Sequence, residues 1–503
     1  MQFCTFVIIT TTLCFLLSCS YKITRRYRSL KPQCLKAAHL TSSFTNQEDY
    51  CQYLLEHSSL PLGFKVGATR FLFQPDEVQQ KLLPMNLTII MTDKPSESFA
   101  AIFTSNKFPG GPVLVGRKRL VFSKFLQAIV INNKISNVCP GGGIADGGFA
   151  DSQSICESVA SSLQLPSSDM VFPSSTGIIG WRLPLEAMKN AIPNVIQNLQ
   201  NASILPAAKG ITTTDRYPKI RSISGTIQST GEKWSIVAIA KGAGMIEPNL
   251  ATMLCYILTD LNIKRPKLQR MLKDAVSNSF NCISVDGDQS TSDTVLAISS
   301  QVIQLPNSNG ISENGDDDSV DEKAFASALQ EICTQLAEDI VRNGEGTQHV
   351  IKVKVSGAPS KLIARGVGKS IVNSNLVKCA ISGCDPNVGR IVGAVGSFLG
   401  NSQIVSGDME AVARSMVVEL GGIEIFSDGC FRLDPAKESA LSDYMLDCQL
   451  YPADLPEESR NYPPHNRVVD ISVRFSGSGS EESTVIGSDL TREYVDVNAD
   501  YRS

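Results

Sequence analysis

The sequence has 503 residues, of which 42% are hydrophobic and 19% are charged, and its formal net charge is −4. A chain of this length is expected to form about two to four structural units and has ample apolar material for a large core. A net charge this close to zero gives no reason to expect a nucleic-acid partner, so any substrate must be recognised by local groups.

The first 45 residues are predicted to be a targeting leader. Residues 3–19 are nearly all apolar or Thr, slightly fewer than the roughly 20 that a membrane-spanning helix needs. A basic segment follows at residues 22–31, and no acidic residue occurs before Glu48. This order is typical of a signal sequence followed by an organelle transit peptide, and a membrane anchor is the alternative. The expected location is a plastid stroma or, as the second choice, a mitochondrial matrix.

Cysteine and histidine spacing gives no sign of a metal site. Four of the 14 cysteines lie in the leader, and the other ten are scattered without a CxxC pair. The histidines are His39, His57, His349 and His465. We therefore expect no bound metal. So few cysteines in so long a chain suit reduced core thiols and a reducing compartment.

Residues 61–131 are predicted to contain short strands. Three apolar segments bounded by Gly, Pro or Asn have strand length: residues 87–91, 100–103 and 128–131. The segment at 140–149 (PGGGIADGGF) is predicted to be a loop because of its glycine content.

Two helices and a buried strand are predicted next. Residues 151–163 have apolar side chains at intervals of four, which indicates a helix, and residues 186–199 predict another. Residues 234–240 (WSIVAIA) form an unbroken apolar run of strand length, typical of a sheet that is buried on both faces. The apolar stretch at 254–261 is expected to be helical.

The second half combines a polar break with further helices and strands. Residues 305–322 (LPNSNGISENGDDDSVDE) are predicted to be an exposed loop insertion. The helix expected after it has five apolar residues along one face: Phe325, Leu329, Ile332, Leu336 and Ile340. Strands are expected at 350–355 and 468–475, and residues 434–466 are predicted to be irregular. Strands and helices intermix over the whole length, so the class is α/β or α+β.

The most informative stretch is residues 241–253, directly after the predicted buried strand. Its KGAG opening supplies a small, permissive backbone, and the Pro-Asn pair that follows imposes a turn. Ala251 is small, so its carbonyl is accessible to the hydroxyl of Thr252. Attack by that hydroxyl would give an ester, and water would open the ester to release a chain that begins at Thr252.

The new α-amine would activate the hydroxyl beside it. An α-amine has a pKa of about 8, so near neutral pH a fraction is unprotonated and can act as the base for the Thr252 hydroxyl. This is the arrangement of a threonine nucleophile activated by its own N-terminal amine. On the residues alone, an ordinary glycine-rich turn is the more common alternative.

The segment KGAGMIEPNLATMLCYILTD (241–260) resembles the signature of the ornithine acetyltransferase family, the ArgJ proteins of arginine biosynthesis. Seven further segments resemble blocks of that family in the same order: GPVLVGRKRL, SSTGIIGWRLP, GITTTDRYPK, NSFNCISVDGDQSTSDT, RNGEGTQH, SGCDPNVGRIVGAVG and YVDVNADYRS. Together they span most of residues 60–503. The resemblance implies cleavage between Ala251 and Thr252, with Thr252 as the nucleophile.

The same resemblance implies roles for other residues. Thr176 and Gly177 match the pair that stabilises the oxyanion, a contribution of roughly 3 to 4 kcal/mol per donor. The implied substrate contacts are Thr213, Lys241, Thr252, Glu345, Asn498 and Ser503. Thr214 is the alternative to Thr213, because the register of that block is uncertain by one residue.

Each role has a structural alternative. Lys241 could be a solvated surface lysine instead of the partner of a substrate carboxylate. Glu345 could lie in a solvated glycine turn, and residues 174–176 could form the cap between a strand and a helix.

The resemblance also implies a reaction and an assembly. Thr252 would take the acetyl group from N-acetylornithine and pass it to glutamate, with no metal or bound organic cofactor and with acetyl-CoA as a second donor in some members. The implied fold is a layered α/β sandwich like that of N-terminal-nucleophile enzymes. The self-cleaved chains, 46–251 and 252–503, would be intertwined, with two copies of each. The alternatives are an amidase or aminopeptidase that uses water as acceptor, and a catalytically inactive binding protein.

Overall fold

The structure is a computed structural model. It describes residues 43–78, 81–141, 146–247, 253–306, 318–401, 409–452, 455–477 and 479–499. Nearly all of the predicted leader, the predicted cleavage residues Ala251 and Thr252, and the C-terminal Ser503 lie outside the described residues. Within these ranges, no helix has the length and apolar character needed to cross a membrane.

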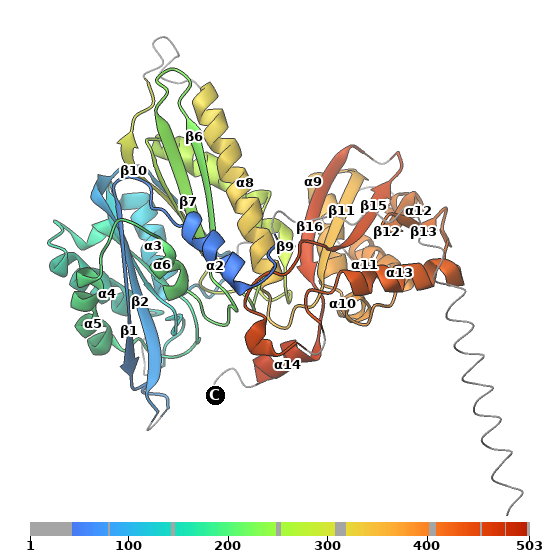
Figure 1. Ribbon diagram of the computed structural model, residues 1–503, viewed down its shortest axis with the longest axis horizontal. Helices are drawn as coiled ribbons and strands as arrows, with labels where there is room; N and C mark the ends of the chain where they lie inside the picture. The colour runs from blue at the N-terminus through green and yellow to red at the C-terminus, as the bar shows by residue number, and fades with distance from the viewer. Residues whose placement is uncertain are drawn as a thin grey trace, which may run out of the picture.

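Two β-sheets stacked face to face form the larger part of the molecule (Figure 1). The first has the strand order β1 (Phe64–Phe73), β2 (Leu83–Ser96), β4 (Leu126–Asn132) and β5 (Val171–Ser175). The second has the order β3 (Phe99–Phe103), β10 (Thr294–Ile303), β8 (Leu254–Leu261), β7 (Lys233–Lys241) and β6 (Lys219–Thr226).

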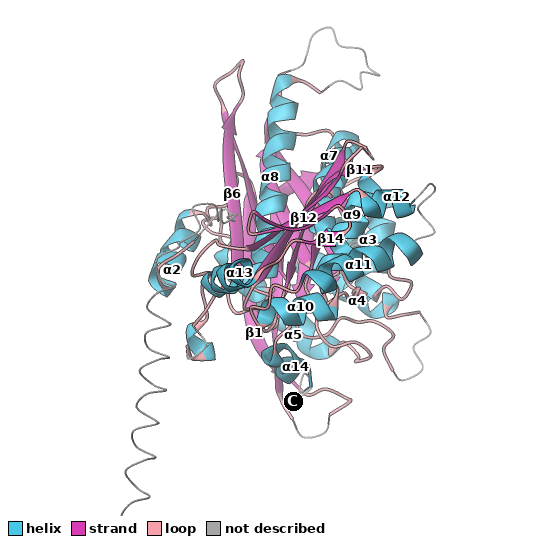
Figure 2. Ribbon diagram, turned by 90° about the vertical axis from the view of Figure 1, so that its right-hand side faces the viewer, coloured by secondary structure: helices cyan, strands magenta, loops and turns pink. Residues whose placement is uncertain are grey.

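Alternation along the strands explains why the two sheets stack. Ile129 and Ile131 of β4 share an apolar cluster with Tyr256 and Leu258 of β8, so this cluster fills the space between the sheets. Side chains at the intervening positions point outward, because successive residues of a strand face opposite sides. Figure 2 shows the long helix α8 (Val320–Arg342) alongside β6.

Helices cover both outer faces of the stacked sheets. The helices α4 (Phe149–Ser162) and α5 (Leu185–Gln197) pack on the four-stranded sheet. The helices α7 (Arg265–Ser277) and α8 pack on the five-stranded sheet. The result is a sandwich of four layers, helix–sheet–sheet–helix, which confirms the predicted layered α/β class. Three shorter helices flank it: α2 (Gln47–Glu56), α3 (Gly111–Phe122) and α6 (Leu205–Gly210).

A seven-stranded sheet forms a second unit, most of which is shown in orange and red in Figure 1. Its strand order is β14 (Cys430–Phe431), β13 (Ile423–Ser427), β12 (Met416–Leu420), β15 (Val469–Phe475), β11 (Val350–Ala358), β16 (Glu481–Ser488) and β9 (Ile283–Ser284). The helices of this unit are α9 (Lys361–Val372), α10 (Asn375–Ser382), α11 (Val388–Asn401), α12 (Met409–Arg414) and α13 (Pro435–Asp447), and α14 (Arg492–Ala499) follows β16.

Most predicted elements are confirmed. The predicted strands at 87–91, 100–103, 128–131, 234–240, 350–355 and 468–475 lie in β2, β3, β4, β7, β11 and β15, and the predicted helices at 151–163 and 186–199 are α4 and α5. The five apolar residues predicted on one face of α8 are all fully buried.

The helix expected at 254–261 is wrong, because these residues form strand β8. This strand lies between β7 and β10, and all eight of its residues are buried. A strand covered on both faces shows no alternation of apolar and polar residues. Its short apolar run therefore cannot be distinguished from a helix by periodicity.

The irregular segment expected at 434–466 is also partly wrong, because it opens with α13. Asp434 caps this helix by accepting hydrogen bonds from the backbone N–H groups of Ala436 and Lys437. Pro435 occupies the first helical position, where its missing N–H costs nothing.

The predicted loop at 305–322 ends earlier than expected, and its residues 307–317 lie outside the described ones. Ser319 caps α8 in a reciprocal arrangement with Glu322, so the acidic end of the segment is the first turn of a helix.

Candidate functional site

Six of the predicted site residues line one cavity of about 270 Å³. They are Thr176, Gly177, Thr213, Lys241, Glu345 and Asn498. They come from five separate segments: the end of β5, the turn before β6, the end of β7, the turn after α8, and α14. The fold therefore gathers residues up to 322 positions apart in sequence (176 to 498) around a single space. The other two predicted residues, Thr252 and Ser503, lie outside the described part of the chain.

Lys241 lies at the end of β7, where it is buried and bonded within the cavity. The side chain is 3% exposed, and its Nζ donates a hydrogen bond to Thr176 Oγ1 at 3.1 Å. A solvated surface lysine is therefore excluded. Burial lowers the pKa of Lys241, while the negative charge of Asp215 opposes that shift. Because Lys241 donates to the Thr176 oxygen, the hydroxyl hydrogen of Thr176 is left to donate to a ligand.

Gly177 has a backbone conformation that suits an oxyanion donor. Its φ is +118°, and a Cβ atom here would lie 2.2 Å from the carbonyl oxygen of Lys134. The Ser136 hydroxyl donates to the Gly177 carbonyl at 2.6 Å and so holds the peptide group between Gly177 and Ile178. The Gly177 N–H has no partner among the described residues. No helix begins here, since the next one, α5, starts at Leu185, so the alternative of a strand-to-helix cap is wrong.

We expect Thr176→Val to lower kcat for acyl transfer by roughly 10²- to 10³-fold, with KM nearly unchanged. Valine keeps the shape of threonine but removes one donor to the developing oxyanion, and such donors act mainly in the transition state. Steady-state kinetics would measure the split, and Thr176→Ser, which retains the hydroxyl, is the matched control. An unchanged kcat for the valine variant would contradict the assigned role.

Glu345 is a second charged side chain that lines the cavity. It is 8% exposed, and its two oxygens accept hydrogen bonds from Thr214 Oγ1 at 2.6 Å and from Asn498 Nδ2 at 2.8 Å. The backbone of Gly244 passes so close that a Cβ atom there would lie 2.2 Å from Glu345 Oε2. Glu345 is therefore a buried, oriented carboxylate, and the alternative of a solvated loop residue is wrong.

The geometry separates the two neighbouring threonines. The Thr214 hydroxyl is committed to Glu345, whereas the Thr213 hydroxyl has no hydrogen-bond partner among the described residues. Both residues line the cavity. Thr213 consequently stays the predicted substrate contact, and Thr214 positions Glu345.

Asp215 organises the site and was not identified from the sequence. Its carboxylate forms an ion pair with Lys219 and accepts backbone N–H groups from Gly242 at 2.9 Å and Thr213 at 3.1 Å. Burial raises the pKa of Asp215, but the charges of Lys219 and Lys241 outweigh it and lower the pKa to about 2. The carboxylate thus connects the start of β6 to the glycine turn after β7. Its only signal in the sequence was its place in the GITTTDRYPK block.

A second buried acid, Asp293, is hydrogen-bonded to Met253, the residue that follows the predicted nucleophile. Its Oδ1 accepts the backbone N–H of Met253 at 2.6 Å, and its Oδ2 has no hydrogen-bond partner among the described residues. Burial raises the pKa of Asp293 well above its usual range. Sequence reasoning also missed several lining residues of the cavity: Ser136, Ile178, Ile179, Gly244, Met245 and Ser290.

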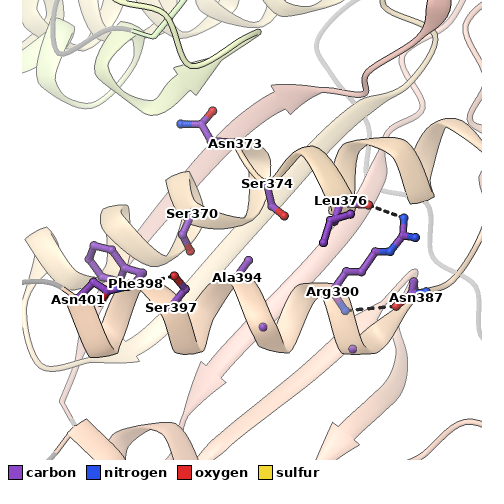
Figure 3. A pocket seen from close by; sticks show the side chains of 12 residues that line it. Ser370, Asn373, Ser374, Leu376, Asn387, Arg390, Ala394, Ser397, Phe398 and Asn401 are labelled. Atoms are coloured by element: carbon purple, nitrogen blue, oxygen red, sulfur yellow. Dashed lines mark hydrogen bonds between the residues drawn. The ribbon is translucent and has the colours of Figure 1, made fainter.

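Two of the other cavities bear on where the site lies. The larger, of about 860 Å³, lies between α9 and α11 and contains none of the predicted residues (Figure 3). Its charged side chain, Arg390, donates to the carbonyl of Leu376 at 2.7 Å. The other, of about 390 Å³, adjoins the predicted site, since both cavities are lined by Gly177 and Thr213, and it carries Arg70 and Lys134. The predicted catalytic and binding residues are therefore concentrated around the 270 Å³ cavity.

Comparison with known proteins gives consistent matches. Residues 76–503 match the ArgJ family. The arginine biosynthesis bifunctional protein ArgJ of Nitratidesulfovibrio vulgaris is 33% identical over 447 residues, which cover 89% of this chain and 100% of that protein. The protein of the same description from Thermosynechococcus vestitus is 35% identical over 421 residues, 83% of this chain and 92% of that protein. A crystal structure of ArgJ from Bacillus halodurans overlaps 48% of this chain and 97% of its own, with 30% identity and a TM-score of 0.38.

Proposed function

The chain belongs to the ArgJ family, and on this premise we propose that it is an acetyltransferase of arginine biosynthesis that moves the acetyl group of N-acetylornithine to glutamate. The observation that carries the proposal is the single cavity in which the Lys241–Thr176 pair and Gly177 meet Glu345 and Asn498. This cavity offers a cation for a carboxylate, an anion for an amine and two donors for an oxyanion. These groups suit N-acetylornithine, which carries a carboxylate, a free side-chain amine and an amide to be cleaved.

The proposed reaction has two acyl-transfer steps. The Thr252 hydroxyl attacks the acetyl carbonyl of N-acetylornithine, and the Thr252 amine takes the hydroxyl proton. The Thr176 hydroxyl and the Gly177 N–H stabilise the tetrahedral oxyanion. The C–N bond then breaks, and ornithine leaves with the proton on its amine. The acetyl group stays on Thr252 as an ester, and the glutamate amine attacks this ester to give N-acetylglutamate.

The substrate ends are held by opposite charges. Lys241 supplies a compact positive charge for the substrate carboxylate. Glu345 faces the amino groups, and each of its oxygens retains acceptor capacity after the bonds from Thr214 and Asn498. Ornithine and glutamate share the amino-acid end, so one cavity can bind them in turn.

We also propose how the chain is processed, how it assembles and where it acts. Cleavage between Ala251 and Thr252 would give chains 46–251 and 252–503, each of which contributes residues to the cavity. Two copies of each chain would form the assembly. After removal of the leader, the enzyme would act in a plastid stroma or a mitochondrial matrix.

No metal or bound organic cofactor takes part in the proposed reaction, and acetyl-CoA is proposed as a second acetyl donor for glutamate. The adjoining cavity of about 390 Å³ supports this addition. It opens beside Gly177 and is lined by Arg70 and Lys134, with no acidic side chain among its lining residues. Such a cavity suits the phosphates of a nucleotide carrier.

A product assay with the leaderless protein tests the proposal. With N-acetylornithine and glutamate, we expect ornithine and N-acetylglutamate in equal amounts, and the same assay with acetyl-CoA tests the second donor. Acetate as the only acyl product would point to the amidase alternative, which the family assignment does not favour. Neither product would point to an inactive binding protein.

A further inference from the structure

Three side chains outside the substrate cavity are arranged as a cysteine–histidine–aspartate triad. His349, just before β11, has its Nδ1 2.8 Å from Asp489 Oδ2, and its Nε2 lies 3.8 Å from the Sγ of Cys384. Asp489 also accepts the backbone N–H of Gln348 at 3.0 Å. The acid therefore orients the imidazole, and the imidazole faces a thiol. Enzymes that activate a nucleophilic cysteine use the same arrangement, in which an acid orients an imidazole and the imidazole activates the thiol.

The surroundings of His349 favour the protonated, imidazolium form of its ring. The side chains of His349 and Asp489 are almost fully buried. Burial lowers the pKa of His349, but the hydrogen bonds with Asp489 and Cys384 outweigh it and raise the pKa to about 9. At neutral pH the ring therefore carries a proton on each nitrogen, one for the carboxylate and one for the sulfur. A cationic neighbour of this kind favours the thiolate form of a cysteine.

Cys384 is the accessible member of the triad. It is partly exposed, whereas Cys156, Cys255, Cys282, Cys333 and Cys448 are buried. It follows the end of α10 with φ +54°, and the backbone bonds from Asp385 N to Ala380 O at 2.8 Å and from Cys384 N to Ile381 O at 3.0 Å close the helix. Glycine is the usual residue at such a helix end. A thiol is therefore held at a fixed point of the surface, next to its imidazole.

We propose that Cys384 is a covalent modification site, a thiol activated by the His349–Asp489 pair for reaction with peroxides and other soft electrophiles. With hydrogen peroxide, the sulfur attacks one peroxide oxygen and the O–O bond breaks. Cysteine is oxidised to the sulfenic acid, peroxide is reduced, and the hydroxide that leaves takes up the thiol proton as water. None of the three residues lines the substrate cavity, so the inference does not depend on the proposed acetyl transfer.

Competitive alkylation of the purified protein tests the proposal. The native protein would be treated with a limiting amount of iodoacetamide at neutral pH, and the labelled fraction at each cysteine would be read by peptide mass spectrometry. Four exposed thiols serve as internal controls: Cys51, Cys139, Cys379 and Cys430. We expect Cys384 to be labelled at least about 10-fold faster than these four, although it is less exposed, because the His349 imidazole lies beside its sulfur. Equal or slower labelling would overturn the proposal.

Two variants identify the cause of that reactivity. His349→Gln removes the positive charge beside Cys384, and Asp489→Asn removes the carboxylate that stabilises that charge. In both variants we expect the labelling rate of Cys384 to fall to that of the exposed controls. His57→Gln, which removes an imidazole bonded to Ser222, should leave the Cys384 rate unchanged. Unchanged Cys384 labelling in both His349→Gln and Asp489→Asn would overturn the proposal.

The buried Cys156 reports whether each variant is folded, because it is labelled only after unfolding. If a variant unfolds, trapping of the sulfenic acid with dimedone in the wild type, after a pulse of hydrogen peroxide, still decides the matter. We expect the adduct at Cys384 and little at the exposed controls. An even distribution would count against the proposal.

Discussion

Thr252→Ala should leave one uncut chain whose acetyl transfer is at least about 10⁴-fold below that of the wild type. The substitution removes the hydroxyl that would attack the Ala251 carbonyl and later carry the acetyl group. It leaves in place the proposed oxyanion donors, Thr176 and Gly177, and the charged side chains of Lys241 and Glu345. Intact mass would give the processing state, and ornithine release would give the rate.

Thr252→Ser is the matched control for that experiment. Serine keeps a hydroxyl and, after cleavage, an α-amine, so we expect it to be processed and to retain part of the activity. The wild type should give two fragments, the second beginning Thr-Met-Leu-Cys. A cleaved alanine variant, or an active wild type that stays in one piece, would exclude Thr252 as the nucleophile.

Asp215→Asn should lower the free energy of unfolding by about 3–5 kcal/mol, because it leaves the Lys219 cation buried without its partner. Both side chains of the ion pair are fully buried. Urea unfolding at neutral pH would measure the loss. Replacing both partners, with Lys219→Met and Asp215→Leu, should cost less than the single change, since the Lys219 cation is removed together with the Asp215 carboxylate. A double variant no more stable than Asp215→Asn would contradict this explanation.

The effect of Asp215→Asn should also depend on pH in one direction. The pKa of Asp215 in the folded protein, about 2, is lower than its usual value of 3.8. A carboxyl group with a depressed pKa contributes stability above its unfolded pKa and loses it as the pH falls through the folded value. The difference in the free energy of unfolding between wild type and Asp215→Asn should therefore be constant above about pH 5. It should become smaller from about pH 4 toward pH 2.

Regular elements were predictable wherever one face met solvent. The apolar face of α8 and the alternation of β15 are visible in the sequence because their other faces are polar. Strand β8 was misassigned because burial of both faces removes the alternation and leaves an apolar run compatible with a strand or a helix. The buried β4 and the largely buried β7 were assigned as strands from the length of their apolar runs. The helix α13 was missed because residues 434–466 as a whole are rich in proline, although Pro435 at the first helical position is compatible with a helix.

The cavity was predictable only in part. Thr176, Lys241 and Glu345 were found through family blocks, and neither spacing nor periodicity would have brought them together. Asp215 and Asp293 were missed because an acidic residue in the sequence carries no sign of being buried. Only the fold shows that Asp215 holds Lys219 and that Asp293 holds the backbone beside Thr252.

The pairing of β7 with β8 determines how this protein can be reassembled. The two strands are antiparallel neighbours in one sheet, from Ile236 opposite Thr259 to Lys241 opposite Leu254. In the uncut chain only residues 242–253 separate them, so their pairing is a local contact that we expect to form early in folding. If the proposed cleavage between Ala251 and Thr252 takes place, the same hydrogen bonds join two separate chains. Refolding of the denatured mature protein would then be a bimolecular reaction whose yield depends on concentration, whereas the uncut precursor would refold as one chain.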